Sequence, residues 1–206
     1  RIRILAEFIV RARAAPVEPE AFRAAIGGGQ GVEYLAEIIR SALFVSQGHR
    51  SDASVHLVLE KSRDFSRIVS FGGENLGSLV DLHEDSMLQA IANALETSSG
   101  LGKDEQITDS RGVTVRTTSF EHLVKARAAE QEIYLLDSSG EDIRDVELNS
   151  SGIFVMTDHT PMPKKSFKSM ARQGVKKVSL GPVILHASQC ITLIHNEMDR
   201  QADHRG

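Results

Sequence analysis

Segment 178–200 carries the residue types best suited to hold a small cofactor. It reads V-S-L-G-P-V-I-L-H-A-S-Q-C-I-T-L-I-H-N-E-M-D-R. A short β-branched run meets a break at Gly181 and Pro182, then continues into a mostly apolar helix that carries Cys190, the only cysteine. A strand, a tight loop and a buried helix in this order form the place where α/β proteins commonly bind small ligands.

A second candidate is a run of basic residues just before this segment. No acidic residue lies between Asp158 and Glu197. The basic residues within that interval are Lys164, Lys165, Lys168, Arg172, Lys176 and Lys177. Such a run can neutralise the phosphates of a nucleic acid. A solvated helix face would show the same pattern, so the sequence leaves both interpretations open.

Other familiar motifs do not match. The glycine-rich segment 27–31 lacks the Gly-Lys-Ser/Thr ending and the preceding strand of a phosphate-binding loop, so we interpret it as a flexible connection. No G-x-G-x-x-G follows an expected strand, which argues against a nicotinamide-dependent enzyme. The eight histidines include no H-E-x-x-H and have no cysteine pair nearby, so we expect no metal ion.

Composition is that of an ordinary globular protein. The 206 residues are 41% hydrophobic and 25% charged, which is enough for one sizeable core. A single cysteine excludes an internal disulfide, and no apolar run approaches the roughly 18 residues of a membrane span. We therefore expect one domain over residues 1–206, no membrane partner and a cytoplasmic location.

Hydrophobic periodicity indicates alternating strands and helices. Helical spacing of apolar residues predicts helices over 32–45, 83–95, 119–129, 165–173 and 185–198. Alternating or β-branched runs predict strands over 5–13, 55–59, 66–71, 113–116, 132–136, 153–156 and 177–180. Residues 97–112 are expected to form a long surface loop, and 137–140 a turn that closes a strand. This repetition favours an α/β fold with a mostly parallel sheet and helices on both faces.

Several motifs taken together resemble those of a known family. They are F-I-V-R-A-R-A-A-P at 8–16, A-L-F-V-S-Q-G-H-R-S-D at 42–52, V-H-L-V-L-E at 55–60, T-D-H-T-P-M-P-K-K-S-F at 157–167, and S-L-G-P followed by L-H-A-S-Q-C-I-T-L-I-H-N-E-M-D at 179–199. The combination is similar to the family of the archaeal tRNA pseudouridine-54 N1-methyltransferase, and most similar to its bacterial branch of pseudouridine methyltransferases. The resemblance covers nearly the whole chain.

This resemblance implies a SPOUT-superfamily fold and an S-adenosylmethionine (SAM)-dependent RNA methyltransferase. In that fold the C-terminal segment threads through a preceding loop and makes a deep trefoil knot, here expected over approximately 130–200, which is a rare exception to unknotted connections. SPOUT proteins usually form homodimers, and helix 185–198 would suit the interface. The expected reaction is N1-methylation of a pseudouridine in tRNA or another structured RNA. A catalytically silent knotted RNA-binding or scaffold protein that kept the cofactor pocket is the alternative.

The resemblance further implies a cofactor site built from three loops at strand ends. Its expected residues are Leu136, Thr157, Ser179, Leu180, Gly181, Pro182, Leu185 and Cys190. Leucines would wall the adenine, Gly181 permits close approach, and Pro182 removes one competing donor. Cys190 is assigned to packing against the cofactor, because N1 of pseudouridine can attack a sulfonium methyl group without covalent activation of the base.

Removal of the N1 proton calls for an acceptor, and carboxylates are the candidates. Asp52, which follows Arg50 in a loop before a strand, is the preferred acid/base or target-orienting residue, and Asp158 is the second choice. A loop salt bridge or an N-terminal cap is the alternative interpretation of Asp52.

Five basic residues are expected to contact RNA, since arginine can bind phosphate or stack on a base. They are Arg11, Arg13, Arg50, Lys164 and Lys165. Arg11 and Arg13 lie two apart on one expected strand and therefore face the same side. Simple alternation on an edge strand would produce the same spacing.

Overall fold

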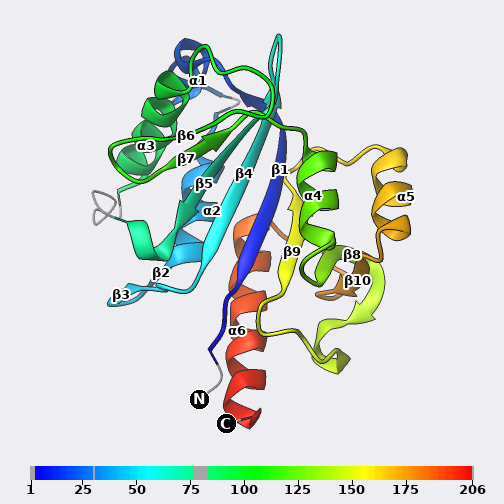
Figure 1. Ribbon diagram of the computed structural model, residues 1–206. Helices are drawn as coiled ribbons and strands as arrows, with labels where there is room; N and C mark the ends of the chain where they lie inside the picture. Colours follow the sequence, from blue (N-terminus) through cyan, green and yellow to red (C-terminus); the bar gives the residue numbers. More distant parts are fainter. Residues whose placement is uncertain (1–2, 30, 77–82, 206) are drawn as a thin grey trace.

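The computed structural model describes residues 3–29, 31–76 and 83–205, and within them the chain builds a large mixed sheet. Its strands are β1 (Glu7–Pro16), β4 (Ser54–Lys61), β5 (Arg67–Gly72), β6 (Gln106–Thr108), β7 (Thr114–Arg116), β8 (Ile133–Asp142), β9 (Ile153–Thr157) and β10 (Lys176–Ser179). They lie in the order β10-β8-β9-β1-β4-β5-β7-β6 (Figure 1). Neighbours from β10 to β4 run parallel, and those from β4 to β6 run antiparallel. A small separate hairpin joins β2 (Phe44–Val45) and β3 (Gly48–His49).

Helices cover both faces of this sheet. They are α1 (Pro19–Ala25), α2 (Tyr34–Leu43), α3 (Glu84–Thr97), α4 (Phe120–Ala128), α5 (Lys164–Arg172) and α6 (Ala187–Arg205). Short 3-10 turns follow β5 at Gly73–Asn75 and β8 at Ile143–Asp145. Buried side chains of α1, α2, α3 and α6 join one apolar cluster, and those of α4 and α5 join the other. The expected α/β architecture with a mostly parallel sheet is confirmed.

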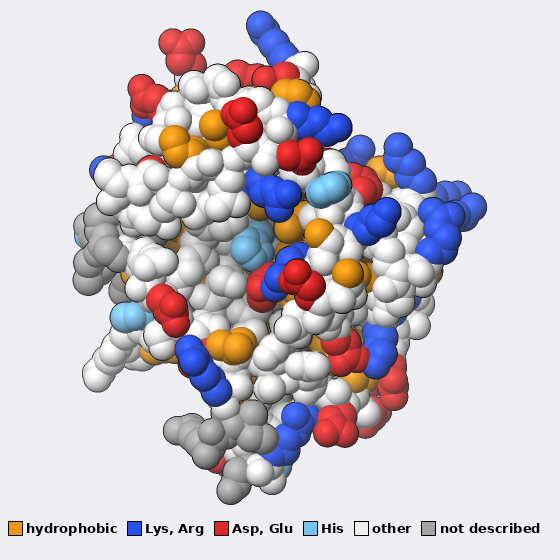
Figure 2. All heavy atoms as spheres, viewed as in Figure 1, with side chains coloured by type: hydrophobic (Ala, Val, Ile, Leu, Met, Phe, Trp, Pro, Cys, Tyr) orange, Lys and Arg blue, Asp and Glu red, His pale blue; other side chains and the backbone are white. Residues whose placement is uncertain are grey.

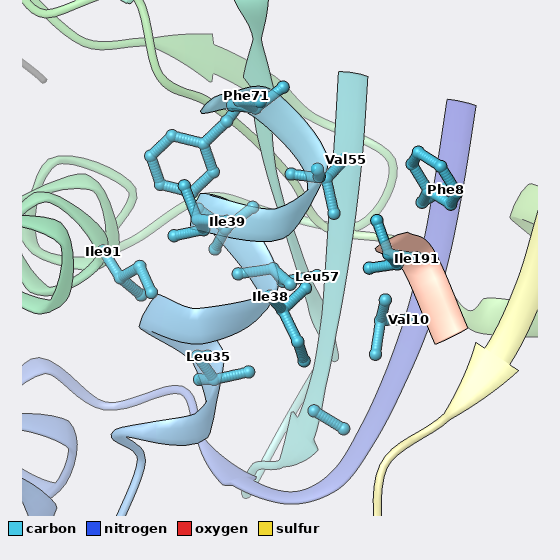
Figure 3. Packing of buried hydrophobic residues seen from close by; sticks show 14 of the residues in the cluster. Phe8, Val10, Leu35, Ile38, Ile39, Val55, Leu57, Phe71, Ile91 and Ile191 are labelled. Atoms are coloured by element: carbon cyan, nitrogen blue, oxygen red, sulfur yellow. The ribbon is translucent and has the colours of Figure 1, made fainter. Parts of the chain in front are cut away.

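The two apolar clusters arise because successive strand side chains point to opposite faces. On β1, Phe8 belongs to the larger cluster and Ile9 to the smaller one. Figure 3 shows the larger cluster, where Ile38 of α2 packs near Leu57 of β4 and Ile191 of α6 lies over β1. All five side chains are at most 1% exposed, and burial of each contributes roughly 1.5–3 kcal/mol. This packing holds α2 and α6 against β1 and β4.

Some expected elements differ from the observed ones. Segment 97–112 is not all loop, because β6 lies within it and pairs with β7. The Asp109 carboxylate closes that hairpin by accepting from the backbone N–H of Arg111 at 2.9 Å and of Val113 at 3.0 Å. Helix α1, which begins at Pro19, was not expected, although proline is common in the first turn of a helix. Helix α6 starts two residues later than expected and continues to Arg205.

Strand β8 does not end at the expected turn. Lys177 of β10 pairs with Leu135, and the next residue, Val178, pairs with Glu141, so 136–140 loop out of the ladder. The turn chemistry is nevertheless present inside the strand, since the Asp137 carboxylate accepts from the N–H and the hydroxyl of residue 139 at 2.8 and 2.7 Å. Segment 136–140 is therefore a wide bulge within β8.

Gly140 ends this bulge at a close approach to β10. A Cβ atom at position 140 would lie 2.6 Å from the carbonyl carbon of Lys177 and 2.6 Å from the nitrogen of Val178. Real Cβ atoms do not approach backbone atoms so closely, so glycine is required for the two chains to meet here.

Candidate cofactor and active site

The parallel strands β8, β9 and β10 lead to one cavity of about 220 Å³. The residues expected to bind cofactor that line it are Leu136, Thr157, Leu180, Gly181, Pro182, Leu185 and Cys190. They come from the β8 bulge, the end of β9, the loop after β10 and the start of α6. The fold therefore brings together three loops that are far apart in the sequence.

Ser179, the remaining expected residue, shapes the loop without lining the cavity. Its hydroxyl oxygen accepts from the backbone N–H of Gly181 at 3.1 Å. Gly181 has φ 115°, in the region that favours glycine because a Cβ atom would be strained there. The hydroxyl and the glycine together turn the chain away from β10 towards α6.

The charged side chains that line this cavity are two carboxylates, Asp137 and Asp158. No Lys, Arg or His occurs among its described lining residues. The hydrogen bonds from Ser139, and then the charge of Lys177, lower the pKa of Asp137, which is therefore ionised at neutral pH. Nζ of Lys177, which does not line the cavity, lies 3.6 Å from Oδ2 of Asp137. A cavity whose charged described lining residues are carboxylates suits a ligand that carries positive charge better than one rich in phosphate.

Cys190 lies on the apolar side of the cavity. Burial raises the pKa of its thiol, so the thiolate that nucleophilic attack needs is scarce at neutral pH. This environment agrees with packing as the role of Cys190.

Asp158 follows β9 and is held by two hydrogen bonds. Its Oδ2 accepts from the hydroxyl of Tyr34 at 2.9 Å, and its Oδ1 accepts from the backbone N–H of Thr160 at 2.9 Å. Burial and the neighbouring Asp158 charge raise the pKa of the Tyr34 hydroxyl, so Tyr34 keeps its proton and remains a donor. Each carboxylate oxygen retains a lone pair for a further proton.

Asp52 lies at the opposite edge of the sheet. It precedes β4, whose first residue Ser54 pairs with Glu7, whereas Thr157 at the end of β9 pairs with Arg11. This register separates Asp52 from Asp158 by about seven strand positions, or ~23 Å at ~3.3 Å each. Within one chain Asp52 therefore lies outside this cavity, whereas Asp158 lines it.

Asp52 pairs with Arg3 and not with the nearby Arg50. Its carboxylate accepts from Nη2 of Arg3 at 2.7 Å and from Nε at 3.1 Å. Arg50 instead donates to both oxygens of Asp199 on α6, at 3.1 and 2.9 Å. Arg50 was expected to contact RNA, but its guanidinium holds α6 to the loop before β4.

Arg11 is a second correction among the expected RNA contacts. Its side chain is only 5% exposed and forms an ion pair with Glu60. It also donates to the hydroxyl of Ser166 at 2.9 Å and lies 4.3 Å from the centre of the Phe120 ring. Arg11 therefore joins β1 to α4 and α5 inside the protein and presents no free guanidinium to RNA.

The other expected RNA contacts are exposed. Arg13 donates to the carbonyl oxygen of Pro161 at 2.8 Å and stays at the surface. The exposed α5 cations that form no ion pair with any described residue are Lys164, Lys165, Lys168 and Arg172. Figure 2 shows Lys and Arg side chains gathered over α5, on the right of that view. By contrast, Lys176 pairs with Glu132.

A larger cavity of about 830 Å³ adjoins the first. It is lined by the end of β1, by α1 and by described residues of the glycine-rich segment, Gly29 and Gly31, while Gln30 lies outside the described residues. Tyr34 and His159 also line it. Since Tyr34 bonds Asp158 and His159 follows it directly, the two cavities share a wall.

The described residues contain no group of three or more His, Cys, Asp or Glu placed to hold a metal ion. Of the helices within the described ranges, none combines the length and apolar character that crossing a membrane requires.

Comparison with known proteins decides the family. A family model described as "Putative SAM-dependent RNA methyltransferase" matches residues 5–202. The chain belongs to this family. A "Putative pseudouridine methyltransferase" from Vibrio parahaemolyticus is 45% identical to this methyltransferase over 192 residues, which cover 93% of this chain and 96% of the relative. One of the same name from Shewanella frigidimarina is 46% identical over 192 residues, with 93% and 97% covered.

The fold of this SAM-dependent methyltransferase also has a solved counterpart. The crystal structure of Archaeoglobus fulgidus Nep1 bound to S-adenosylhomocysteine matches with a TM-score of 0.62 at 11% identity, covering 98% of this chain and 100% of that one. At this identity the likeness is one of fold. The family resemblance inferred from sequence, and with it SAM as cofactor, is confirmed by the family match.

Three residues that line the two cavities were not expected there from the sequence. Asp137 was interpreted as a turn residue, Tyr34 as part of a helix, and His159 as a member of a family motif without a role. Of these residues, only His159 could have been suspected from the sequence, because it directly follows the candidate acid Asp158. Tyr34 and Asp158 are 124 positions apart, and no spacing rule joins them.

Proposed function

We propose that this chain methylates N1 of a pseudouridine in a structured RNA, with tRNA as the first candidate. SAM would bind in the acidic cavity at the ends of β8, β9 and β10. The observation that carries the proposal is the pair of carboxylates, with no cation among the described lining residues, around a cavity of apolar strand ends. These carboxylates suit a positively charged sulfonium. The names of the 45–46% identical relatives favour pseudouridine as the target.

The lining residues fit the remaining parts of the cofactor. Leu136, Leu180, Leu185 and Cys190 offer apolar contact for adenine, and backbone groups at strand ends offer donors and acceptors for its edge. About 220 Å³ is below the roughly 300–1,000 Å³ of common ligand sites, so bound SAM would fill the cavity and extend past its rim. When bound, SAM supplies an electrophilic methyl group.

In this mechanism the chain positions the reactants and removes one proton. SAM held against Leu136, Leu180, Leu185 and Cys190 would supply the methyl group to N1 of pseudouridine, and its sulfur would keep the electron pair of the broken carbon–sulfur bond. Asp158 accepts the N1 proton through a carboxylate oxygen that Tyr34 and Thr160 hold in place. Alignment of reactants can contribute roughly 7–11 kcal/mol in favourable cases, so the rigid strand ends matter as much as the acid.

Replacement of Asp158 tests the assignment. Asp158→Asn should lower the rate of methylation of a pseudouridine-containing RNA by about 10²–10⁴-fold, the usual contribution of a general base. Calorimetry should show unchanged affinity for S-adenosylhomocysteine. The matched control is Asp52→Asn, at the opposite edge of the sheet, which should retain near-normal activity. Full activity in the Asp158 variant would rule out Asp158 as the base.

Digestion of the labelled RNA to nucleosides tests the substrate. Label in N1-methylpseudouridine is the expected result, and label on another base would reject the pseudouridine assignment. Cofactor binding without turnover on any RNA would favour a catalytically silent RNA-binding protein instead.

We further propose a single domain over 1–206, a C-terminal knot over approximately 130–200, a cytoplasmic location and a homodimer. The wide β8 bulge and the close contact of Gly140 with β10 support a threaded C-terminal half. Apolar side chains that line the cofactor cavity and remain largely exposed support the dimer. They are Val183, which is 70% exposed, and Ile184, which is 96% exposed. A second copy would cover them.

A further inference from the structure

We infer that the larger cavity receives the target nucleoside, turned out of the RNA, and presents its base to Asp158. This inference rests on the proposed function and adds the place of the substrate. The volume of about 830 Å³ lies within the roughly 300–1,000 Å³ of small-ligand sites, so a base with its sugar can enter. Enzymes that modify a base in a folded nucleic acid commonly extrude it into such a pocket.

The walls of this cavity suit a flat, uncharged ring. Small side chains leave room for it along β1 and α1: Ala14, Ala15, Ala21, Ala24 and Ala25. The rings of Tyr34 and His159 meet edge to face at the inner end, with centroids 5.7 Å apart, and provide aromatic surface beside the base.

Charge in the cavity also indicates a nucleoside in preference to a free nucleotide. The charged side chains that line it are Lys61 and Glu18, whose charges are opposite. A nucleoside triphosphate would bring several negative charges to a cavity with one cation among its described lining residues. Within an RNA strand, the flanking phosphates can lie outside, towards the unpaired cations of α5.

The wall between the cavities places the base where the reaction needs it. Asp158 lines the cofactor cavity, while Tyr34, bonded to it at 2.9 Å, and His159 line the larger one. The loop that carries Asp158 and His159 continues to α5 along the carboxyl edge of the sheet (Figure 1). Arg13 fixes this loop by its bond to the Pro161 carbonyl at 2.8 Å.

A base-dependent binding measurement tests the inference without relying on turnover. A labelled RNA hairpin with one pseudouridine in its loop is compared with the same hairpin abasic at that position, both with S-adenosylhomocysteine present. In the unaltered protein the base should strengthen binding at least about 5-fold, the lower end of a base-stacking contact. Ala24→Trp, an exposed α1 residue that lines the cavity, should reduce this ratio to near one.

The control is Ala126→Trp on the exposed face of α4. This variant should bind the pseudouridine hairpin more tightly than the abasic hairpin by the same factor as the unaltered protein. If Ala24→Trp does not fold, Ala21→Trp fills the same cavity from the same helix. A ratio that survives cavity filling, or that is already near one in the unaltered protein, overturns the inference. Loss of S-adenosylhomocysteine binding or of methylation by the unaltered protein would instead count against the proposed function, so the two failures are distinguishable.

Discussion

Asp158 is oriented by donors from two separate parts of the chain. Thr160 belongs to its own loop, but Tyr34 stands at the start of α2, so the position of the carboxylate depends on how α2 packs against the sheet. The tyrosine cannot replace Asp158 as the base, because its raised pKa keeps it protonated at neutral pH. Its contribution is to position the Asp158 carboxylate.

Tyr34→Phe should therefore lower the rate of the reaction. Loss of one hydrogen bond is expected to lower kcat about 2- to 10-fold at neutral pH. A double-mutant cycle provides the control: in an Asp158→Asn background the substitution should have no further effect on kcat. An unchanged kcat for Tyr34→Phe in the otherwise unaltered chain would assign Tyr34 to packing alone.

The contact between α6 and α2 contains a histidine that is buried without charge. His195 is 4% exposed, and its Nε2 lies 2.9 Å from the carbonyl oxygen of Ala42. Burial, followed by the charge of Arg50, lowers the pKa of His195 to about 4. Its ring also meets that of Phe8 edge to face, with centroids 4.9 Å apart.

Acidification should weaken this contact between elements. Since the folded-state pKa of His195 is lowered from 6.5 to about 4, the unfolded chain binds a proton that the folded chain excludes as pH falls below 6.5. The loss of stability should approach about 2 kcal/mol between pH 7 and pH 5 from this residue. Urea unfolding at both pH values measures it. In His195→Gln this component of the pH dependence should be absent, whatever the variant's stability at pH 7.

Helix α5 offers a separate element for RNA binding. Its cations lack ion-pair partners among the described residues, so their counterions are free to be displaced by RNA. Replacing Lys165 and Lys168 together by glutamine should lower the slope of log affinity against log salt by about two, one for each phosphate contact. The control is Lys176→Gln, whose cation already pairs with Glu132 and should change the slope less. If the double variant leaves the slope of log affinity against log salt unaltered, α5 is a solvated face that does not contact RNA.

At the scale of the whole molecule, the proposed homodimer is checked by light scattering at micromolar concentration. The unaltered chain should have twice the mass of one copy. Ile184→Glu places a charge on a side chain that is 96% exposed beside the cofactor cavity, and should shift the equilibrium towards the monomer. The matched control is Val45→Glu on the β2–β3 hairpin, where the Val45 side chain is 44% exposed. This variant should leave the dimer equilibrium unchanged. A clean monomer for the unaltered chain would exclude the dimer.

Sequence periodicity predicted most of the fold because it records which residues face the core. Helix α2 and strands β4 and β9 lie close to the expected ranges, since each buries a regular apolar pattern. Strand β7 was also predicted, but β6 was missed because this short strand has no fully buried side chain. The cofactor loops came from family motifs, and the structure brings their residues around one cavity.

The choice between the two acids depended on information that local patterns lack. Asp52 and Asp158 both adjoin strands and basic or polar neighbours, but one precedes its strand and the other follows it. In a parallel sheet these positions belong to opposite edges. Likewise, the spacing of Arg11 and Arg13 predicted that their side chains point to the same face of the sheet. Only the packed structure shows that Arg11 lies under α4 and α5.

Gly140 has a consequence for the size of the cofactor cavity, although it does not line it. It touches the backbone of β10 at the start of the loop that leads to Leu180, and it ends the bulge that carries Leu136. A single methyl group at this position would act as a spacer and push two walls of the cavity apart. The distance between those two walls therefore depends on the absence of a Cβ atom at position 140. A residue that does not line the ligand site thus influences its dimensions.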